Sequence, residues 1–295
     1  MQDPRSYVFS LDLVKTSPDH VSFLQEVSTH HALQNVAVLR QALYRYEHLW
    51  LPLAAKWPHE ALAAPLDIEW VWHCHLLSPV AYQRDCMSIV GTIVDHHLFS
   101  QKERAKRLNR SRTLWTSEYP HQPFDQDPGC PEDPRASAPS KLTYDIIAAA
   151  ERQSVFFYQV SLPHFRDRKF LNAAEARYRK FLWLKQQNPR LFIVPCYDID
   201  LIWHTHQLHP VGYKKDMEAV LGHTFNHDDS VTDRSEGSKL YNSDMETREL
   251  WRNTFGENFA LYGAMYRGDP PAGKLYAMTE GTGVCAVNQV SCLSV

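Results

Sequence analysis

The chain has 295 residues, of which 44% are apolar and 22% are charged, so one large or two smaller packed domains are expected. The formal net charge of −3 gives no basic surface for nucleic acid, which we therefore do not expect as a partner. The N-terminus lacks a signal-peptide pattern, there is no apolar run of 18 residues, and the six cysteines form no Cys-x-x-Cys pair, so we expect a cytoplasmic protein with no membrane span.

The first 120 residues are predicted to form five helices. Ser17-Pro18-Asp19 has the pattern of a helix N-terminus, because serine caps helices and proline is tolerated in their first turn. Pro79 separates two later helices, and Gly91 ends the second of them. Apolar spacing places the other four helices over residues 36–53, 67–77, 80–90 and 102–119.

The second half repeats this arrangement after a linker. Six prolines lie between residues 120 and 139 and predict an extended linker over 121–140. Helices are then expected over 141–160, 170–187, a second copy of the 67–77 motif, 211–221 and the region around Trp251, with a polar loop over 228–238. Residues 191–194 are the one short β-like run, and the tail 269–295 has no clear period.

One motif occurs twice at a constant offset of 131 residues. Its centre is Trp72-His73-Cys74-His75 in the first copy and Trp203-His204-Thr205-His206 in the second. Residues 67–91 and 198–222 share 11 of 25 positions. A repeat of this length indicates a duplicated domain. The sequence therefore predicts an all-α fold with two five-helix halves, over 1–120 and 141–268, packed about a pseudo-two-fold axis.

Helical geometry divides the repeated histidines into two sets. Residues two apart on a helix point about 200° apart, so His204 and His206 cannot bind one ion on a regular helix. His204 shares a face with Asp200, four residues earlier, as His73 does with Glu69. The two carboxylate–histidine pairs together offer four ligands for a transition-metal ion such as Fe, Zn, Mn or Cu.

A second arrangement of ligands is also open. His75 and His206 face the apolar side of their helices, and they could combine with His96 and His227, which align with each other in the loops after the next helix. When His73, His75, His204 and His206 are all taken as ligands or as groups that orient the ligands, His96 and His227 would be the third ligand of each half. This pooling of six histidines favours a metal site, because buried imidazoles without partners cost free energy.

Tyr82 and Tyr213 are the candidate catalytic residues, as the repeated hydroxyl groups that could orient the ligands or a substrate. The structural alternative is that the histidines are ordinary buried polar groups, each exchanging hydrogen bonds with the repeated tyrosines and aspartates.

The motifs resemble those of the glycine-rich domain-containing proteins of plants and fungi. The resemblance covers about residues 7–260. It rests on Ser10-Leu-Asp-Leu-Val14, Arg45-Tyr46-Glu47-x-x-Trp50-Leu-Pro-Leu53, Leu66-Asp-Ile-Glu-Trp-Val-Trp-His-Cys-His75, Pro79-Val-Ala-Tyr82 and Asp198-Ile-Asp-Leu-Ile-Trp-His-Thr-His-Gln207. It implies the domain arrangement and no particular reaction. The glycine-rich tail of longer members is absent here, where the chain has 11 glycines, so any RNA role of that tail is not carried over.

The sequence thus predicts a metal-binding duplicated helical protein. If it is an enzyme, a metal-dependent oxidoreductase or hydrolase acting on a small molecule or peptide is the expected class. The alternative is a non-catalytic interaction module, in which the histidines are core groups and a groove between the halves binds a peptide or RNA.

Overall fold

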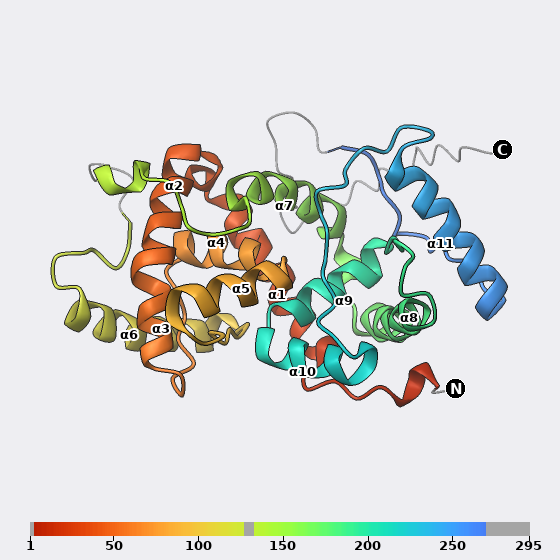
Figure 1. The fold of residues 1–295 in the computed structure, drawn as a ribbon, viewed down its shortest axis with the longest axis horizontal. Helices are drawn as coiled ribbons and strands as arrows, with labels where there is room; N and C mark the ends of the chain where they lie inside the picture. Colours follow the sequence, from red (N-terminus) through yellow and green to blue (C-terminus); the bar gives the residue numbers. More distant parts are fainter. Residues whose placement is uncertain (1–2, 127–132, 270–295) are drawn as a thin grey trace.

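The fold is all-α, as predicted. The structure is a computed structural model that describes residues 3–126 and 133–269, and there is no β-strand in this part of the chain. The first half contains α1 (Leu13–Thr29), α2 (Val36–Arg45), α3 (Leu51–Lys56), α4 (Leu66–Leu76), α5 (Pro79–Val90) and α6 (Gln101–Glu118) (Figure 1). The second half contains α7 (Ile146–Val160), α8 (Arg168–Gln187), α9 (Tyr197–Gln207), α10 (Pro210–Leu221) and α11 (Lys239–Phe255).

A π-helix over Tyr46–Trp50 joins α2 to α3, so the predicted helix over 36–53 is one continuous helical segment. Each half therefore contributes five helical segments. Short 3-10 turns occupy Pro4–Ser6, His31–Gln34, Pro134–Ser137 and Pro163–Arg166. The pseudo-two-fold relation between the halves stays a prediction.

Two helices begin four or more residues from their predicted starts, because aspartates provide their caps. Asp12 accepts a hydrogen bond from the Lys15 amide at 3.0 Å, so α1 begins at Leu13 and Pro18 lies inside the helix. Asp145 caps α7 in the same way, so α7 begins at residue 146 and not at 141. The β-like run 191–194 is irregular, and its Val194 amide donates to a threonine hydroxyl.

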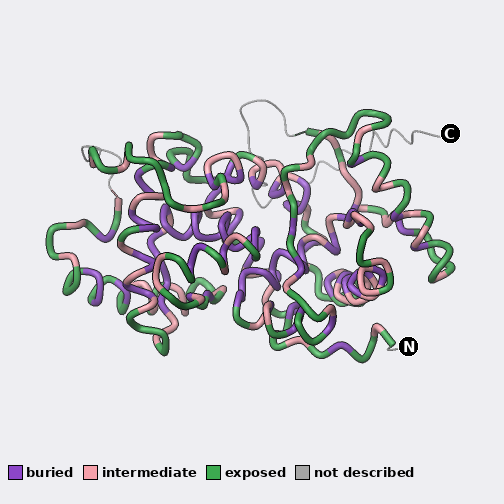
Figure 2. The backbone as a smooth tube through the Cα atoms, viewed as in Figure 1, coloured by how far each residue is buried: buried purple, intermediate pink, exposed green. Residues whose placement is uncertain are grey.

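The first helix of each half packs on the other half. α1 contacts α8 and α9, and α7 contacts α2 and α4. Figure 1 shows the N-terminal segment running beside α10 and α8, away from the rest of the first half. We call this packing of each first helix on the other half the exchange of α1 and α7. Two equivalent anchors fix it: Ser10 donates main-chain and hydroxyl hydrogen bonds to Asp216, and Thr143 donates the same pair to Asp85. The halves are therefore interlocked, and buried residues continue from one into the other (Figure 2).

The linker is only partly described. Residues 127–132 lie outside the described residues, as does the tail beyond Asp269. The turn Pro134–Ser137 packs against α2, so the end of the linker is held on the first half. Across residues 3–126 and 133–269, every helix is too short or too polar to cross a membrane.

Candidate metal centre

The two motif helices, α4 and α9, hold the loops that follow α5 and α10. Trp72 Nε1 donates to the Tyr82 hydroxyl at 3.0 Å, and that hydroxyl donates to the Val94 carbonyl at 2.6 Å. Trp203 and Tyr213 form the same chain of hydrogen bonds in the second half. The Tyr82 and Tyr213 hydroxyls are thus occupied in fixing the loops that carry His96 and His227.

His75 and His206 lie on the face of their helices that points away from the other motif histidines. His75 Nε2 donates a hydrogen bond to Asp85 at 3.1 Å. His75 Nδ1 accepts a hydrogen bond from the Tyr46 hydroxyl at 3.0 Å. His206 has Asp216 and Tyr178 in these roles. Burial lowers the pKa of both imidazoles, so each is neutral with the proton on Nε2. Both ring nitrogens are used, and no lone pair remains for a metal ion.

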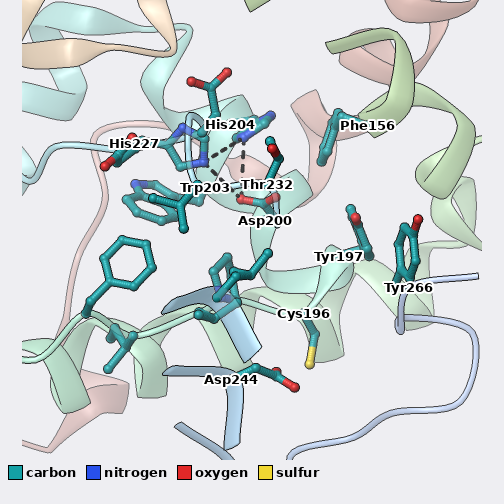
Figure 3. Close-up of a pocket in the computed structure, with 18 of the residues that line it drawn as sticks. Phe156, Cys196, Tyr197, Asp200, Trp203, His204, His227, Thr232, Asp244 and Tyr266 are labelled. Atoms are coloured by element: carbon teal, nitrogen blue, oxygen red, sulfur yellow. Dashed lines mark hydrogen bonds and ion pairs between the residues drawn. The ribbon is translucent and has the colours of Figure 1, made fainter. Parts of the chain in front are cut away.

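Asp200, His204 and His227 come together in the second half. His204 Nε2 lies 3.4 Å from Asp200 Oδ1, His227 Nε2 lies 3.6 Å from the same oxygen, and the two nitrogens are 3.3 Å apart. Figure 3 shows the three side chains converging, with the contacts dashed. Within the described residues, this is the one group of three or more His, Cys, Asp or Glu side chains with metal-ligand spacing.

The pKa values of the two histidines in this cluster are shifted in opposite directions. Burial, together with His227, holds the pKa of His204 well below its ordinary value, so this imidazole is neutral. Burial alone would lower the pKa of His227, but Asp200 and the Leu77 carbonyl raise it. His227 Nδ1 faces that carbonyl at 3.3 Å and donates to it, which directs Nε2 toward Asp200. Asp200 Oδ1 is buried and has no hydrogen-bond partner.

The cluster forms part of the wall of a cavity of about 880 Å³. Such a volume is typical of sites for small molecules. Phe156 packs on His204 with ring centroids 4.2 Å apart, and Trp203 contacts His227 edge-on at 4.8 Å. These aromatic rings fix both imidazoles. Tyr82 and Tyr213 do not line the cavity.

The equivalent residues of the first half form a closed ion pair. His96 Nε2 lies 2.6 Å from Glu69 Oε1, and His96 Nδ1 lies 2.5 Å from the Leu208 carbonyl. Burial alone would raise the pKa of Glu69, but His96 lowers it below its ordinary value. Burial alone would lower the pKa of His96, but Glu69 and the Leu208 carbonyl raise it above its ordinary value. Both nitrogens of His96 therefore donate to oxygens, as in an imidazolium, and it has no free lone pair.

His73 has His20 on α1 as its hydrogen-bond partner. The His20 and His73 Nε2 atoms are 3.0 Å apart, and His20 Nδ1 lies 3.1 Å from Thr205 Oγ1. Thr205 donates its own proton to the Leu201 carbonyl, so His20 donates to Thr205 and accepts from His73. Burial lowers the pKa of His20 to about 3, which keeps this chain of hydrogen bonds neutral.

Three sequence differences make the two halves unlike. Glu69 has one methylene more than Asp200 and reaches its histidine directly. Gln153 on α7 stands where α1 has His20, so α7 provides no imidazole to His204. The N-caps of α6 and α11, Ser100 and Ser238, are seven residues further apart than the 131-residue offset of the motif. The loop that follows α10 is therefore longer than the loop that follows α5. It provides part of the cavity wall.

The sequence prediction omitted His20, Gln153 and the cavity residue Arg234. His20 and Gln153 occupy equivalent positions when the segments before the motif helices are aligned at an offset of 133 residues. The same offset matches Ser10 with Thr143. Arg234 lies in the inserted part of the longer loop, which has no counterpart in the first half. A repeat comparison therefore could not have found it.

Comparison with known proteins agrees with the repeat. The profile of the glycine-rich domain-containing protein-like family matches residues 2–85 and 81–216. Glycine-rich domain-containing protein 2 of Arabidopsis thaliana is 41% identical over 275 residues, which are 89% of this chain and 35% of that protein. Glycine-rich domain-containing protein 1 of the same plant is 40% identical over 277 residues, 89% of this chain and 34% of that protein.

The chain thus spans about a third of the length of these curated relatives. No solved structure matches it. Each of the two matches to the family profile contains one of the repeated motif helices, which fits a duplication. The chain belongs to the glycine-rich domain-containing protein-like family.

Proposed function

We propose that the protein binds one transition-metal ion through Asp200, His204 and His227 and acts as a metal-dependent hydrolase in the adjoining cavity. The observation that carries this proposal is the Asp200 carboxylate oxygen, which is buried without a hydrogen-bond donor and faces two imidazole nitrogens. A buried carboxylate oxygen with no partner costs free energy. A cation bound between the three atoms removes this cost.

The spacing of the three atoms favours a four-coordinate ion. Zinc lies about 2.0–2.1 Å from nitrogen and oxygen ligands, so two ligands of a tetrahedral site are about 3.3–3.4 Å apart. The observed separations are 3.3, 3.4 and 3.6 Å. The 90° angles of an octahedral site would bring the ligands to about 3.0 Å. Zinc is therefore the favoured ion of the four expected from the sequence.

Three protein ligands leave the fourth position of such a site for water or substrate. This is the pattern of catalytic zinc sites, whereas structural sites use four protein ligands. A zinc-bound water ionises near neutral pH and attacks carbonyl or phosphoryl groups. The same two-histidine, one-carboxylate set also occurs in iron oxygenases, so metal identity decides between hydrolysis and oxidation.

Metal analysis of the purified protein tests the proposal. We expect about one zinc per chain in the wild type and in His73→Gln, and a loss of at least tenfold in His204→Gln. His73→Gln is a matched control because it changes the same motif position in the half with no cluster. Zinc should also raise the melting temperature of the metal-free wild type, since a ligand that binds the folded state stabilises it.

A different result would contradict the proposal. Wild-type protein that contains no metal, and whose melting curve does not move on adding zinc, iron(II), manganese or copper, would exclude the metal site. The non-catalytic interaction module would then be the better description.

A further inference from the structure

Two arginines that line the cavity are neutralised by carboxylates within the protein. Arg152 Nη2 lies 3.0 Å from Asp229 and 3.1 Å from the Tyr144 hydroxyl. Arg248 forms an ion pair with Asp244 at 2.8 Å. These two arginines are therefore committed to the wall of the cavity.

The other charged groups of the wall also have partners. Lys185 donates to the main-chain carbonyls of Pro189 and Leu191. The remaining carboxylates accept hydrogen bonds from near neighbours in sequence: Asp228 from Ser230, Asp233 from Ser235 and Asp269 from Tyr266. These hydrogen bonds orient the side chains on the wall but do not neutralise their charges.

Arg234 is an exposed side chain at the wall of the cavity. Its guanidinium lies 4.2 Å from the ring centroid of Tyr266 and donates to the Tyr197 hydroxyl at 3.1 Å. No carboxylate among residues 3–126 and 133–269 forms an ion pair with it. Two phenol rings thus hold an uncompensated cation at the cavity wall, in the manner of an arginine prepared for an anion.

Helix α9 relates Arg234 to the metal ligands. Tyr197 is the first residue of α9, and Asp200 and His204 follow three and seven residues later, so all three lie on one face. One turn of helix, about 5 Å, separates Tyr197 from Asp200. Figure 3 shows Tyr197 and Tyr266 on one side of Asp200 and the two histidines on the other. Arg234 and the three proposed ligands line the same cavity, so one bound molecule is expected to contact both.

We propose that the substrate of this site carries an anionic group, a carboxylate or a phosphate, that binds Arg234 while its reacting group lies at the metal. This inference rests on the proposed function. The planar guanidinium matches both kinds of anion with paired hydrogen bonds. Phe156, Trp203 and Phe225 also line the cavity, so the body of the substrate is apolar or aromatic.

Calorimetric titration of the zinc-loaded protein tests the inference. The probes are phenyl phosphate, benzoate and inorganic phosphate, with benzyl alcohol as the neutral comparison. We expect at least one anionic probe to bind tenfold or more tightly than benzyl alcohol, and Arg234→Gln to lose at least tenfold of this affinity. Arg252→Gln is the matched control, because Arg252 is exposed on α11 and does not line the cavity. Preference for benzoate or for the phosphates identifies the anion.

The outcomes separate this inference from the metal proposal. If Arg234→Gln keeps its zinc and binds the anionic probes as the wild type does, the arginine role is wrong and the metal site stands. If no anionic probe binds better than benzyl alcohol, the inference is also overturned. If the wild type holds no metal, the metal proposal fails, and the same titration of metal-free protein still measures the contribution of Arg234.

Discussion

At the scale of single residues, one methylene group separates a candidate metal ligand from a closed ion pair. Glu69 reaches His96 at 2.6 Å, whereas Asp200 stays 3.6 Å from His227. The longer side chain satisfies its histidine directly, and the shorter one leaves room for an ion. Side-chain length is one of the three differences between the halves, since Glu69 and Asp200 occupy the same position of the repeat.

Exchanging these two acids should exchange their behaviour. In Asp200→Glu we expect the carboxylate to contact His227 directly and the zinc content to fall at least tenfold, with the helical circular dichroism unchanged. In Glu69→Asp we expect unchanged zinc and a loss of about 1–3 kcal/mol in the free energy of unfolding, because the contact with His96 is lengthened. Stoichiometric zinc in Asp200→Glu would show that side-chain length does not control the site.

The Glu69–His96 pair should give stability a defined pH dependence. The raised pKa of His96 contributes stability below its unfolded value of 6.5, and this is lost as pH rises through the folded pKa. The lowered pKa of Glu69 contributes above its unfolded value of 4.5, and this is lost as pH falls through the folded pKa. The pair therefore stabilises most between about pH 4.5 and 6.5.

Urea unfolding of the wild type and Glu69→Gln measures this effect. We expect a difference of about 3 kcal/mol at pH 5.5, since removing one partner leaves a buried charge unpaired, and a smaller difference at pH 9. A difference that is constant from pH 5.5 to 9, or that grows toward pH 9, would mean that His96 is not an imidazolium in the folded protein.

At the scale of elements, the first helices of the two halves are exchanged by specific polar anchors. Asp216 accepts hydrogen bonds from the amide and the hydroxyl of Ser10, both at 2.6 Å, and it also accepts one from His206. Asp85 accepts hydrogen bonds from the amide and the hydroxyl of Thr143, both at 2.8 Å. Each carboxylate thus joins a motif histidine of its own half to the helix start of the other half.

Double-mutant cycles should detect these anchors. Asp216→Asn and Asp85→Asn are each expected to cost about 2 kcal/mol, because each removes hydrogen bonds to a charged acceptor. Ser10→Ala should couple to Asp216→Asn but add independently to Asp85→Asn, and Thr143→Ala should do the reverse. The readout is the free energy of unfolding in urea. Coupling within each sequence half, in place of coupling across them, would contradict the exchange.

The sequence predicted the helices of the motif well because their signals are local. Pro79 begins α5, and Gly91, with a φ of 73°, ends it in the left-handed conformation that glycine adopts most easily. The start of α1 was misplaced because Asp12 and Ser17 both have capping chemistry, and only packing selects Asp12. Ser17 instead donates its hydroxyl to the Leu13 carbonyl inside the helix.

The candidate site could be predicted only in part. Helical spacing placed Asp200 beside His204, the repeat added His227, and the structure brings these three side chains together. The same reasoning treated Glu69, His73 and His96 as equivalent ligands, because the repeat does not reveal that His20 binds His73. That contact joins α1 to α4 over 53 residues of sequence, so it is a tertiary property with no local sequence signal.

At the scale of the whole molecule, the exchange makes the two halves dependent on each other. α1 covers α8 and α9, and α7 covers α2 and α4, so each half taken alone would expose the apolar surface that the other half's helix buries. The linker, by contrast, joins the halves without providing a motif residue. Connectivity through the linker should therefore matter less than the presence of both halves.

Replacing residues 127–132 with a specific protease site tests this dependence. After cleavage, we expect the two fragments to elute together at the mass of the intact chain and to keep its helical circular dichroism and its zinc. Expressed separately, the same fragments should show little cooperative unfolding, because the helix that completes each core is missing, and mixing them should restore both helicity and metal binding. The uncleaved variant is the control for the inserted site. Fragments that separate under native conditions, or that each melt cooperatively alone, would show that the halves are independent domains and that the contacts of α1 and α7 contribute little to stability.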